Sequence, residues 1–112
     1  MADDLMADIE IAPLAIKHRL DRGEKFLFVD VREKWEHDTA CIEGAKLIPL
    51  REIPSHVTEL DEAEDIVLFC HHGMRSLDAA AWLRAQGVAG ARSMSGGIDR
   101  WAVEIDPRVP RY

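Results

Sequence analysis

The chain alternates short, continuous apolar segments with longer stretches of helical pattern, and this alternation is what most limits its possible folds. The runs FLFV within Lys25–Asp30 and IVLF within Asp65–Cys70 carry no polar residue at every second position. Continuous runs of this kind are typical of strands buried on both faces of a parallel sheet. With helical segments between them, they predict an α/β fold with a mainly parallel sheet of four or five strands.

The expected elements can be placed along the chain in order. Strands are predicted at Ile9–Ile11, Lys25–Asp30, Ala45–Pro49, Asp65–Cys70 and Ala91–Met94. Helices are predicted at 13–22, 33–38, 51–60, 76–86 and 98–103, followed by an irregular, proline-rich tail. Pro13 suits the first turn of a helix, and Pro54 is placed in the first turn of the helix 51–60. Asp78 is placed in the first turn of the helix 76–86, where the helix dipole favours a negative charge.

Length and charge exclude several classes of function. A chain of 112 residues is expected to form one compact domain over 1–112. Its net charge of −7 argues against a nucleic-acid partner, because such a binder needs a basic surface to neutralise phosphates. No apolar run approaches the roughly 20 residues of a membrane span, and the acidic start does not resemble a signal peptide. We therefore expect a cytoplasmic protein with no membrane partner.

The two cysteines, Cys41 and Cys70, do not form a recognisable metal or redox motif. A disulfide between them is disfavoured in the cytoplasm. Neither belongs to a C-x-x-C pair, and the adjacent His71 and His72 would point to different sides of a regular element, so no metal site is predicted. Cys70 is then either a buried packing residue or a nucleophile.

The position of Cys70 favours a nucleophile. Parallel α/β sheets bind their ligands at the carboxyl ends of the strands, and Cys70 is expected at such an end. The segment His71–Arg75 joins it to a helix, so the N–H groups of a curled loop and of a helix start can form an anion-binding nest. Gly73 gives the backbone freedom for the curl, and Arg75 adds a positive charge. Ser76 can donate a hydrogen bond to the sulfur, and donors around a sulfur favour the nucleophilic thiolate.

Three segments together resemble the rhodanese-like sulfurtransferases. The segment FCHHGMRS, followed by a helix of small residues, is similar to the active-site loop of that family. Phe26–Leu50 is similar to its Asp-Val-Arg strand end, short helix and Ile-x-Gly-Ala turn, and Ser93–Trp101 is similar to its glycine-pair and tryptophan segment. The resemblance covers almost the whole chain and implies the rhodanese fold, a mainly parallel sheet of about five strands with helices on both faces.

The resemblance also implies a function, in which Cys70 carries a sulfane sulfur as a persulfide. A Cys70 thiolate would attack a donor such as thiosulfate, release sulfite, and pass the sulfur to cyanide or a thiol. Backbone N–H groups of the loop would stabilise the anionic outer sulfur. The acceptor could also be a thioredoxin-like or sulfur-carrier protein, and no metal or organic cofactor is required. The residues expected to bind the substrate and the persulfide are His71, His72, Gly73, Met74, Arg75 and Ser76.

Two other functions are compared with this one. Cysteine phosphatases and arsenate reductases resemble this arrangement but place five residues between cysteine and arginine, whereas only 71–74 separate Cys70 from Arg75. A shorter loop suits one sulfur atom better than a tetrahedral phosphate. The second alternative is a non-catalytic rhodanese-like module that binds partners or senses sulfur or redox state, and the intact cysteine loop with its arginine argues against it.

Five further residues are expected to support the site rather than react. Asp30 and Arg32 lie at the end of a strand, and we expect them to organise the loop through buried hydrogen bonds. The backbone N–H groups of His71 and His72 are expected to matter more than their rings. Met74 is expected to form an apolar lip of the pocket.

Cys41 and the tryptophans have simpler expected roles. Cys41 stands where the family usually has histidine, before the Ile-x-Gly-Ala turn. It could resolve the Cys70 persulfide as a disulfide, but we favour a small buried residue that fills space. Trp35, Trp82 and Trp101 are expected to pack in the core and at its edge.

Overall fold

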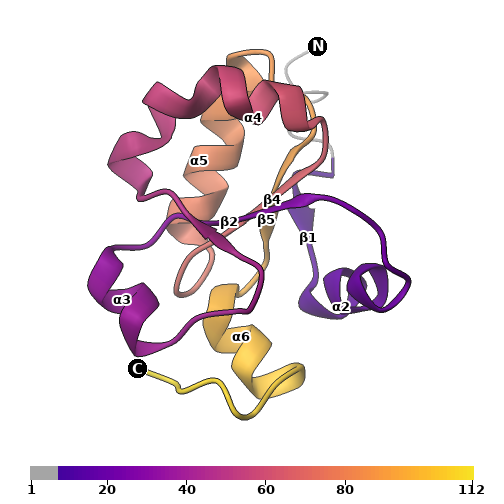
Figure 1. Ribbon diagram of the computed structural model, residues 1–112, viewed down its shortest axis with the longest axis vertical. Helices are drawn as coiled ribbons and strands as arrows, with labels where there is room; N and C mark the ends of the chain where they lie inside the picture. Colours follow the sequence, from indigo (N-terminus) through magenta and orange to yellow (C-terminus); the bar gives the residue numbers. More distant parts are fainter. Residues whose placement is uncertain (1–7) are drawn as a thin grey trace.

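The computed structural model describes residues 8–112, and a five-stranded sheet lies at its centre (Figure 1). All strand pairs are parallel, in the order β1-β5-β4-β2-β3. The predicted α/β fold with a mainly parallel sheet of about five strands is confirmed. The strands are β1 (Glu10–Ile11), β2 (Leu27–Asp30), β3 (Lys46–Leu47), β4 (Ile66–Phe69) and β5 (Ala91–Met94).

Helices cover both faces of the sheet (Figure 1). Helices α4 and α5 lie on one face together with a 3₁₀ helix, η1, while α2 and α6 lie on the other. The short α3 follows β2 at the carboxyl edge of the sheet. The helices are α2 (Pro13–Asp21), α3 (Lys34–Thr39), η1 (Leu50–His56), α4 (Val57–Ala63), α5 (Met74–Ala85) and α6 (Gly97–Glu104). Within residues 8–112, no helix has the length and apolar character needed to cross a membrane.

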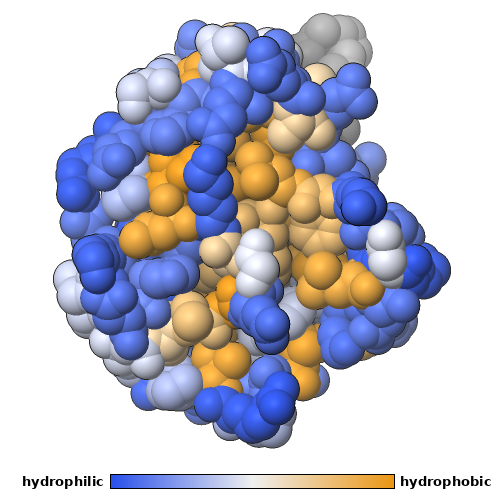
Figure 2. All heavy atoms as spheres, viewed as in Figure 1, coloured by the Kyte–Doolittle hydropathy of each residue, from blue (hydrophilic) through white to orange (hydrophobic). Residues whose placement is uncertain are grey.

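The central position of β4 explains why its sequence is apolar at every position. Ile66 and Leu68 pack in the cluster below α4 and α5, whereas Val67 and Phe69 pack in the cluster below α2 and α6. Successive side chains of a strand point to opposite faces, so a central strand covered on both sides has no polar position. On the outside, hydrophilic side chains dominate the periphery of the view in Figure 2, and hydrophobic ones show mainly near its centre.

Two predicted helices differ from the structure by more than one residue at an end. Helix α5 begins at Met74 instead of residue 76, because Gly73 adopts a left-handed φ of 104° and turns the chain directly into the helix. The placement of Asp78 in the first turn is therefore wrong. The predicted helix 51–60 is divided into η1 and α4, and Pro54 lies inside η1. The missing N–H of Pro54 is easier to accommodate in a short 3₁₀ segment than in an α-helix.

The tryptophans are buried to different degrees. Trp101 is 4% exposed and packs against Phe28, as expected for a core residue. Trp82 is 39% exposed, which fits an edge position. Trp35 is 63% exposed, so the expectation that it packs in the core or at its edge is wrong. Its ring instead lies edge-on against Tyr112 from the C-terminal tail.

Candidate active site

Cys70 directly follows the central strand β4, at the carboxyl edge of the sheet. Its neighbours in space are the strand ends of β2 and β5, because Asp30 pairs with Phe69 and Leu68 pairs with Ser93. The residue is 1% exposed. Only residues 71–73 separate it from the first turn of α5, so the sulfur lies at the amino end of that helix.

Three hydrogen-bond donors converge on the Cys70 sulfur. The backbone N–H of Gly73 donates to Sγ at 3.1 Å, and the backbone N–H and hydroxyl of Ser76 each donate at 3.4 Å. The Ser76 hydroxyl also lies 2.7 Å from that of Ser93 on β5. The structure thus brings two of the residues named from the sequence, Gly73 and Ser76, into direct contact with the thiol. Donors in this arrangement suit a sulfur that carries negative charge.

Helix α6 holds the other side of the loop. The N–H groups of Ile98 and Asp99 donate to the carbonyl oxygens of Cys70 and His71, at 2.9 and 3.1 Å. This close approach requires glycine at position 97, because a Cβ there would lie 2.5 Å from the Cys70 oxygen and 2.4 Å from the His71 oxygen. The glycine pair of the sequence therefore fixes the loop carbonyls on α6, and the N–H groups of Gly73 and Ser76 remain free to face the sulfur.

Arg75 is not a bare positive charge above the thiol, because Glu36 binds its guanidinium. The two terminal nitrogens of Arg75 donate to the two carboxylate oxygens of Glu36, at 2.7 and 2.9 Å. Glu36 lies in α3 and is 4% exposed. The Arg75 bonds, with a bond from Tyr112, lower the pKa of Glu36 to about 2, and the same ion pair raises the pKa of Arg75. The charge of Arg75 is shared and its orientation is fixed.

Sequence reasoning missed Glu36, although a local signal was present. Glu36 is the third residue of α3, and its carboxylate accepts a hydrogen bond from the backbone N–H of Glu33. Glu33 and Glu36 form a capping box, a motif that can be recognised from glutamate three residues after a helix cap. That signal marks a helix start and says nothing of the distant arginine that the same carboxylate binds.

Asp30 and Arg32 form a fully buried ion pair beside the loop. The Arg32 guanidinium donates to both carboxylate oxygens of Asp30, at 2.8 and 2.7 Å. Its remaining donors bind the backbone oxygens of Glu36 and Ala40, at 3.2 and 2.6 Å. These bonds attach the middle and the C-terminal end of α3 to the end of β2. The contacts fit a residue pair that organises the site and does not touch substrate.

Tyr112 is a second residue that sequence reasoning missed. Its hydroxyl donates to Glu36 at 2.7 Å and accepts from Arg32 at 2.9 Å. Its ring stacks on that of His71, with centroids 3.9 Å apart and planes 8° apart. Burial raises the pKa of Tyr112 to about 12, so the hydroxyl keeps its proton. The proline-rich tail carried no periodic pattern that would have placed this ring at the loop.

The two histidines of the loop stack on each other, with centroids 3.9 Å apart. Burial lowers the pKa of His71, which favours the neutral ring. Polar atoms of His71, His72 and Asp99 lie within 4.8 Å of one another, a spacing that a metal ion could use. However, Arg111 donates to both oxygens of Asp99, so this carboxylate is already paired. We assign no metal to this cluster.

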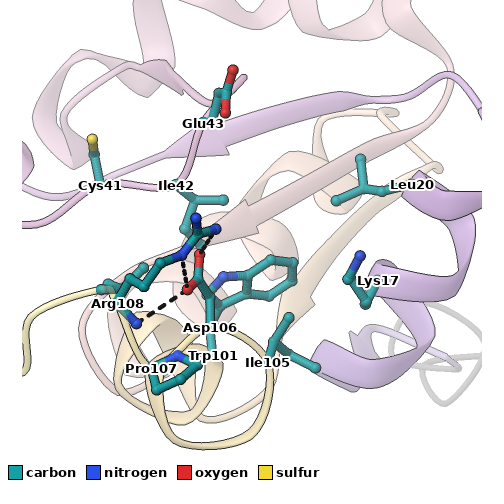
Figure 3. A pocket seen from close by; sticks show the side chains of 11 residues that line it. Lys17, Leu20, Cys41, Ile42, Glu43, Trp101, Ile105, Asp106, Pro107 and Arg108 are labelled. Atoms are coloured by element: carbon teal, nitrogen blue, oxygen red, sulfur yellow. Dashed lines mark hydrogen bonds and ion pairs between the residues drawn. The ribbon is translucent and has the colours of Figure 1, made fainter.

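Two remaining residues lie at the surface. Met74 is 72% exposed at the start of α5, next to the loop. Cys41 is also exposed, so the prediction that it is a small buried residue is wrong. After α3 the chain is extended, and alternate residues Ala40 and Ile42 take the buried positions. Cys41 borders a groove of about 480 Å³, where its sulfur points away from Trp101 (Figure 3).

Comparisons with known proteins identify the family of the chain. Residues 13–104 match the family described as "Rhodanese-like domain". The probable adenylyltransferase/sulfurtransferase MoeZ of Mycobacterium tuberculosis is 36% identical over 104 residues, which cover 91% of this chain and 26% of that protein. The chain thus spans about a quarter of the length of that relative. A sulfurtransferase of Allochromatium vinosum is 34% identical over 93 residues, covering 83% of this chain and 87% of that protein.

A solved structure shows the same fold. The human single-domain sulfurtransferase TSTD1 superposes with a TM-score of 0.75 at 25% identity, and the match covers 86% of this chain and 96% of that one. The family match extends over most of the chain and includes the Cys70 loop, α3 and α6. The chain belongs to the rhodanese-like sulfurtransferase family.

Proposed function

We propose that this protein is a sulfurtransferase that carries a sulfane sulfur on Cys70 as a persulfide. The observation that supports this most directly is the convergence of three donors, from Gly73 and Ser76, on the Cys70 sulfur. The donors come from a loop and a helix start that are fixed by α6, so they need no rearrangement when negative charge is present. The proposed sulfur transfer requires neither a metal nor an organic cofactor.

The reaction has two displacement steps. In the first, the Cys70 thiolate attacks the outer sulfur of a donor such as thiosulfate, the sulfur–sulfur bond of the donor breaks, and sulfite leaves with the electron pair. The product is Cys70–S–S⁻, whose terminal sulfur carries the negative charge. In the second step, cyanide or an acceptor thiolate attacks that terminal sulfur, and the Cys70 thiolate leaves. Backbone N–H groups of the loop stabilise the charge in both steps.

Arg75 is proposed to attract the anionic donor to this loop. Its guanidinium is held by Glu36 at 2.7 and 2.9 Å, and its side chain is still 36% exposed. Because Glu36 occupies the fork formed by the two terminal nitrogens, Arg75 is proposed to act on the sulfonate end of thiosulfate through its positive charge. The biological acceptor is proposed to be a thiol, carried by a small molecule or by a thioredoxin-like or sulfur-carrier protein.

Intact-mass measurement after incubation with thiosulfate tests the proposal. The wild type is expected to gain the mass of one sulfur atom, and Cys70→Ser is expected to gain nothing. Cys41→Ser is the matched control, because it removes the exposed thiol and leaves the Cys70 loop unchanged; it should gain one sulfur like the wild type. An unmodified wild-type protein, in which iodoacetamide nevertheless alkylates Cys70, would contradict the proposal.

A turnover assay with thiosulfate and cyanide separates the remaining alternatives. A sulfurtransferase forms thiocyanate repeatedly, and Cys70→Ser abolishes this. A non-catalytic sensing module would accept one sulfur and show no turnover. Hydrolysis of p-nitrophenyl phosphate, measured in parallel, is expected to be absent, because the loop from Cys70 to Arg75 is one residue shorter than a phosphate cradle of this type.

A further inference from the structure

The C-terminal tail contacts the active-site loop through Tyr112, whose ring stacks on His71. After α6 the chain runs as an irregular segment and ends beside α3 (Figure 1). Arg111 anchors this segment on α6 through two bonds to Asp99, at 2.8 and 3.2 Å. We propose that Tyr112 is a positioning residue of the active site: its hydroxyl tunes the Glu36–Arg75 pair and its ring holds His71. This inference rests on the proposed sulfur transfer at Cys70.

The hydroxyl of Tyr112 donates to the same carboxylate that binds Arg75 and that caps α3 through the N–H of Glu33. One Glu36 oxygen accepts from Arg75 at 2.9 Å and from Tyr112 at 2.7 Å, and the other accepts from Arg75 at 2.7 Å. The bond from Tyr112 takes up part of the negative charge of Glu36. Without it, more of the carboxylate charge acts on Arg75, and the guanidinium attracts other anions less strongly. The hydroxyl therefore sets how much positive charge Arg75 offers to an anionic donor.

The ring of Tyr112 acts on the residue next to the nucleophile. It covers one face of His71 with nearly parallel planes, and His72 covers the other face. The backbone oxygen of His71 is meanwhile bound by the N–H of Asp99 in α6. His71 is thus held through its side chain by the tail and through its backbone by α6. Since His71 directly follows Cys70, loss of the ring is expected to loosen the loop that supplies the sulfur with donors.

Two substitutions separate these contributions. Tyr112→Phe keeps the ring stack and removes the hydroxyl, whereas Tyr112→Leu removes both. Arg108→Ala is the matched control, because the exposed Arg108 pairs with Asp106 within the same tail and has no contact with the loop. All three variants are checked for folding by thermal unfolding before their kinetics are compared.

The first measurement is the KM and kcat for thiosulfate. Tyr112→Phe is expected to raise KM about tenfold, the typical effect of one hydrogen bond to a charged group, and to change kcat by less than about twofold. Tyr112→Leu is expected to raise KM and also to lower kcat, because a loosened loop stabilises both displacement steps less well. Arg108→Ala is expected to match the wild type in both.

The second measurement does not depend on sulfur transfer. Cys70 is alkylated with anionic iodoacetate and with neutral iodoacetamide in a Cys41→Ser background, and the ratio of the two rates is taken. Tyr112→Phe is expected to lower this ratio about tenfold, because only the anion feels the charge of Arg75. A purely structural role of Tyr112 would change both rates by the same factor and leave the ratio unchanged.

The results distinguish this inference from the proposed function. A wild type that forms no persulfide with thiosulfate refutes the proposed function, and the alkylation ratio then still decides the role of Tyr112. Persulfide formation in the wild type, together with an unchanged KM and an unchanged alkylation ratio in Tyr112→Phe, overturns the inference about Tyr112 alone. Equal changes in KM and in the alkylation ratio in Arg108→Ala also overturn the inference about Tyr112, because the effect would then belong to the tail as a whole.

Discussion

Replacement of Glu36 by glutamine removes the charge that links α3 to the Cys70 loop, and its cost is expected to depend on pH. In the folded protein the bonds from Arg75 and Tyr112 lower the pKa of Glu36 from 4.5 to about 2. A tenfold change in proton affinity corresponds to about 1.4 kcal/mol, so the ionised carboxylate contributes about 3 kcal/mol to the free energy of unfolding. The side chain is only 5% exposed, so solvent screens this interaction little.

The sign of the pH dependence follows from the direction of the shift. A group whose pKa is lower in the folded state stabilises the protein above its unfolded pKa, and this contribution is lost as the pH falls toward the folded pKa. The contribution of Glu36 is therefore complete above about pH 5 and disappears between pH 4.5 and about 2. The difference in stability between wild type and Glu36→Gln should be about 3 kcal/mol near neutral pH and should approach zero near pH 2.

Urea unfolding of the two proteins over this range of pH provides the measurement. Glu59→Gln is the control, because Glu59 also forms bonds, to Lys46 and His56, but lies at the exposed surface where ion pairs contribute little. The free energy of unfolding of Glu59→Gln should differ little from that of the wild type at every pH. A difference between wild type and Glu36→Gln that stays constant from neutral pH to pH 3 would show that the ion pair is not the source of the stabilisation.

Two further substitutions test the loop and the buried ion pair. Gly97→Ala would place a Cβ 2.4 Å from the His71 oxygen, and a loop displacement of about 1 Å is expected to slow persulfide formation about a hundredfold. Gly87→Ala is its control, since that glycine also has a positive φ but has open space around its Cβ, and equal effects of the two on persulfide formation would refute the clash argument. Arg32→Met leaves the buried Asp30 with only the His37 ring and the backbone N–H of residue 32 as partners, and it is expected to lower the free energy of unfolding by about 3–5 kcal/mol, measured with urea. A loss of free energy of unfolding below about 1 kcal/mol, the usual contribution of an exposed ion pair, would contradict this prediction.

The sheet was predictable from the sequence, because its signal is local. In β4 every residue is apolar because helices cover both faces of the sheet. Such a continuous apolar run can be recognised as a strand without knowledge of the rest of the chain. The start of α5 was placed two residues late, because the left-handed backbone of Gly73 determines it. Glycine tolerates that conformation, but the presence of a glycine does not predict it.

The residues that surround the cysteine loop were only partly predictable. The loop itself follows from its position between a strand and a helix. The bonds that join Glu36 to Arg75 and Tyr112 span 39 and 76 residues of sequence, so no local pattern marks them. Cys41 was misplaced for a similar reason, since the end of α3 decides which of the following residues faces the core.

The sheet ends on both sides in very short strands, and this affects how the fold behaves beside other polypeptides. Strands β1 and β3 contain two residues each, and Lys46 on β3 is exposed and paired with Glu59. A long open edge offers a row of unpaired N–H and C=O groups that can recruit a strand from another chain, whereas a short, charged edge offers almost none. Such a sheet resists edge-to-edge aggregation.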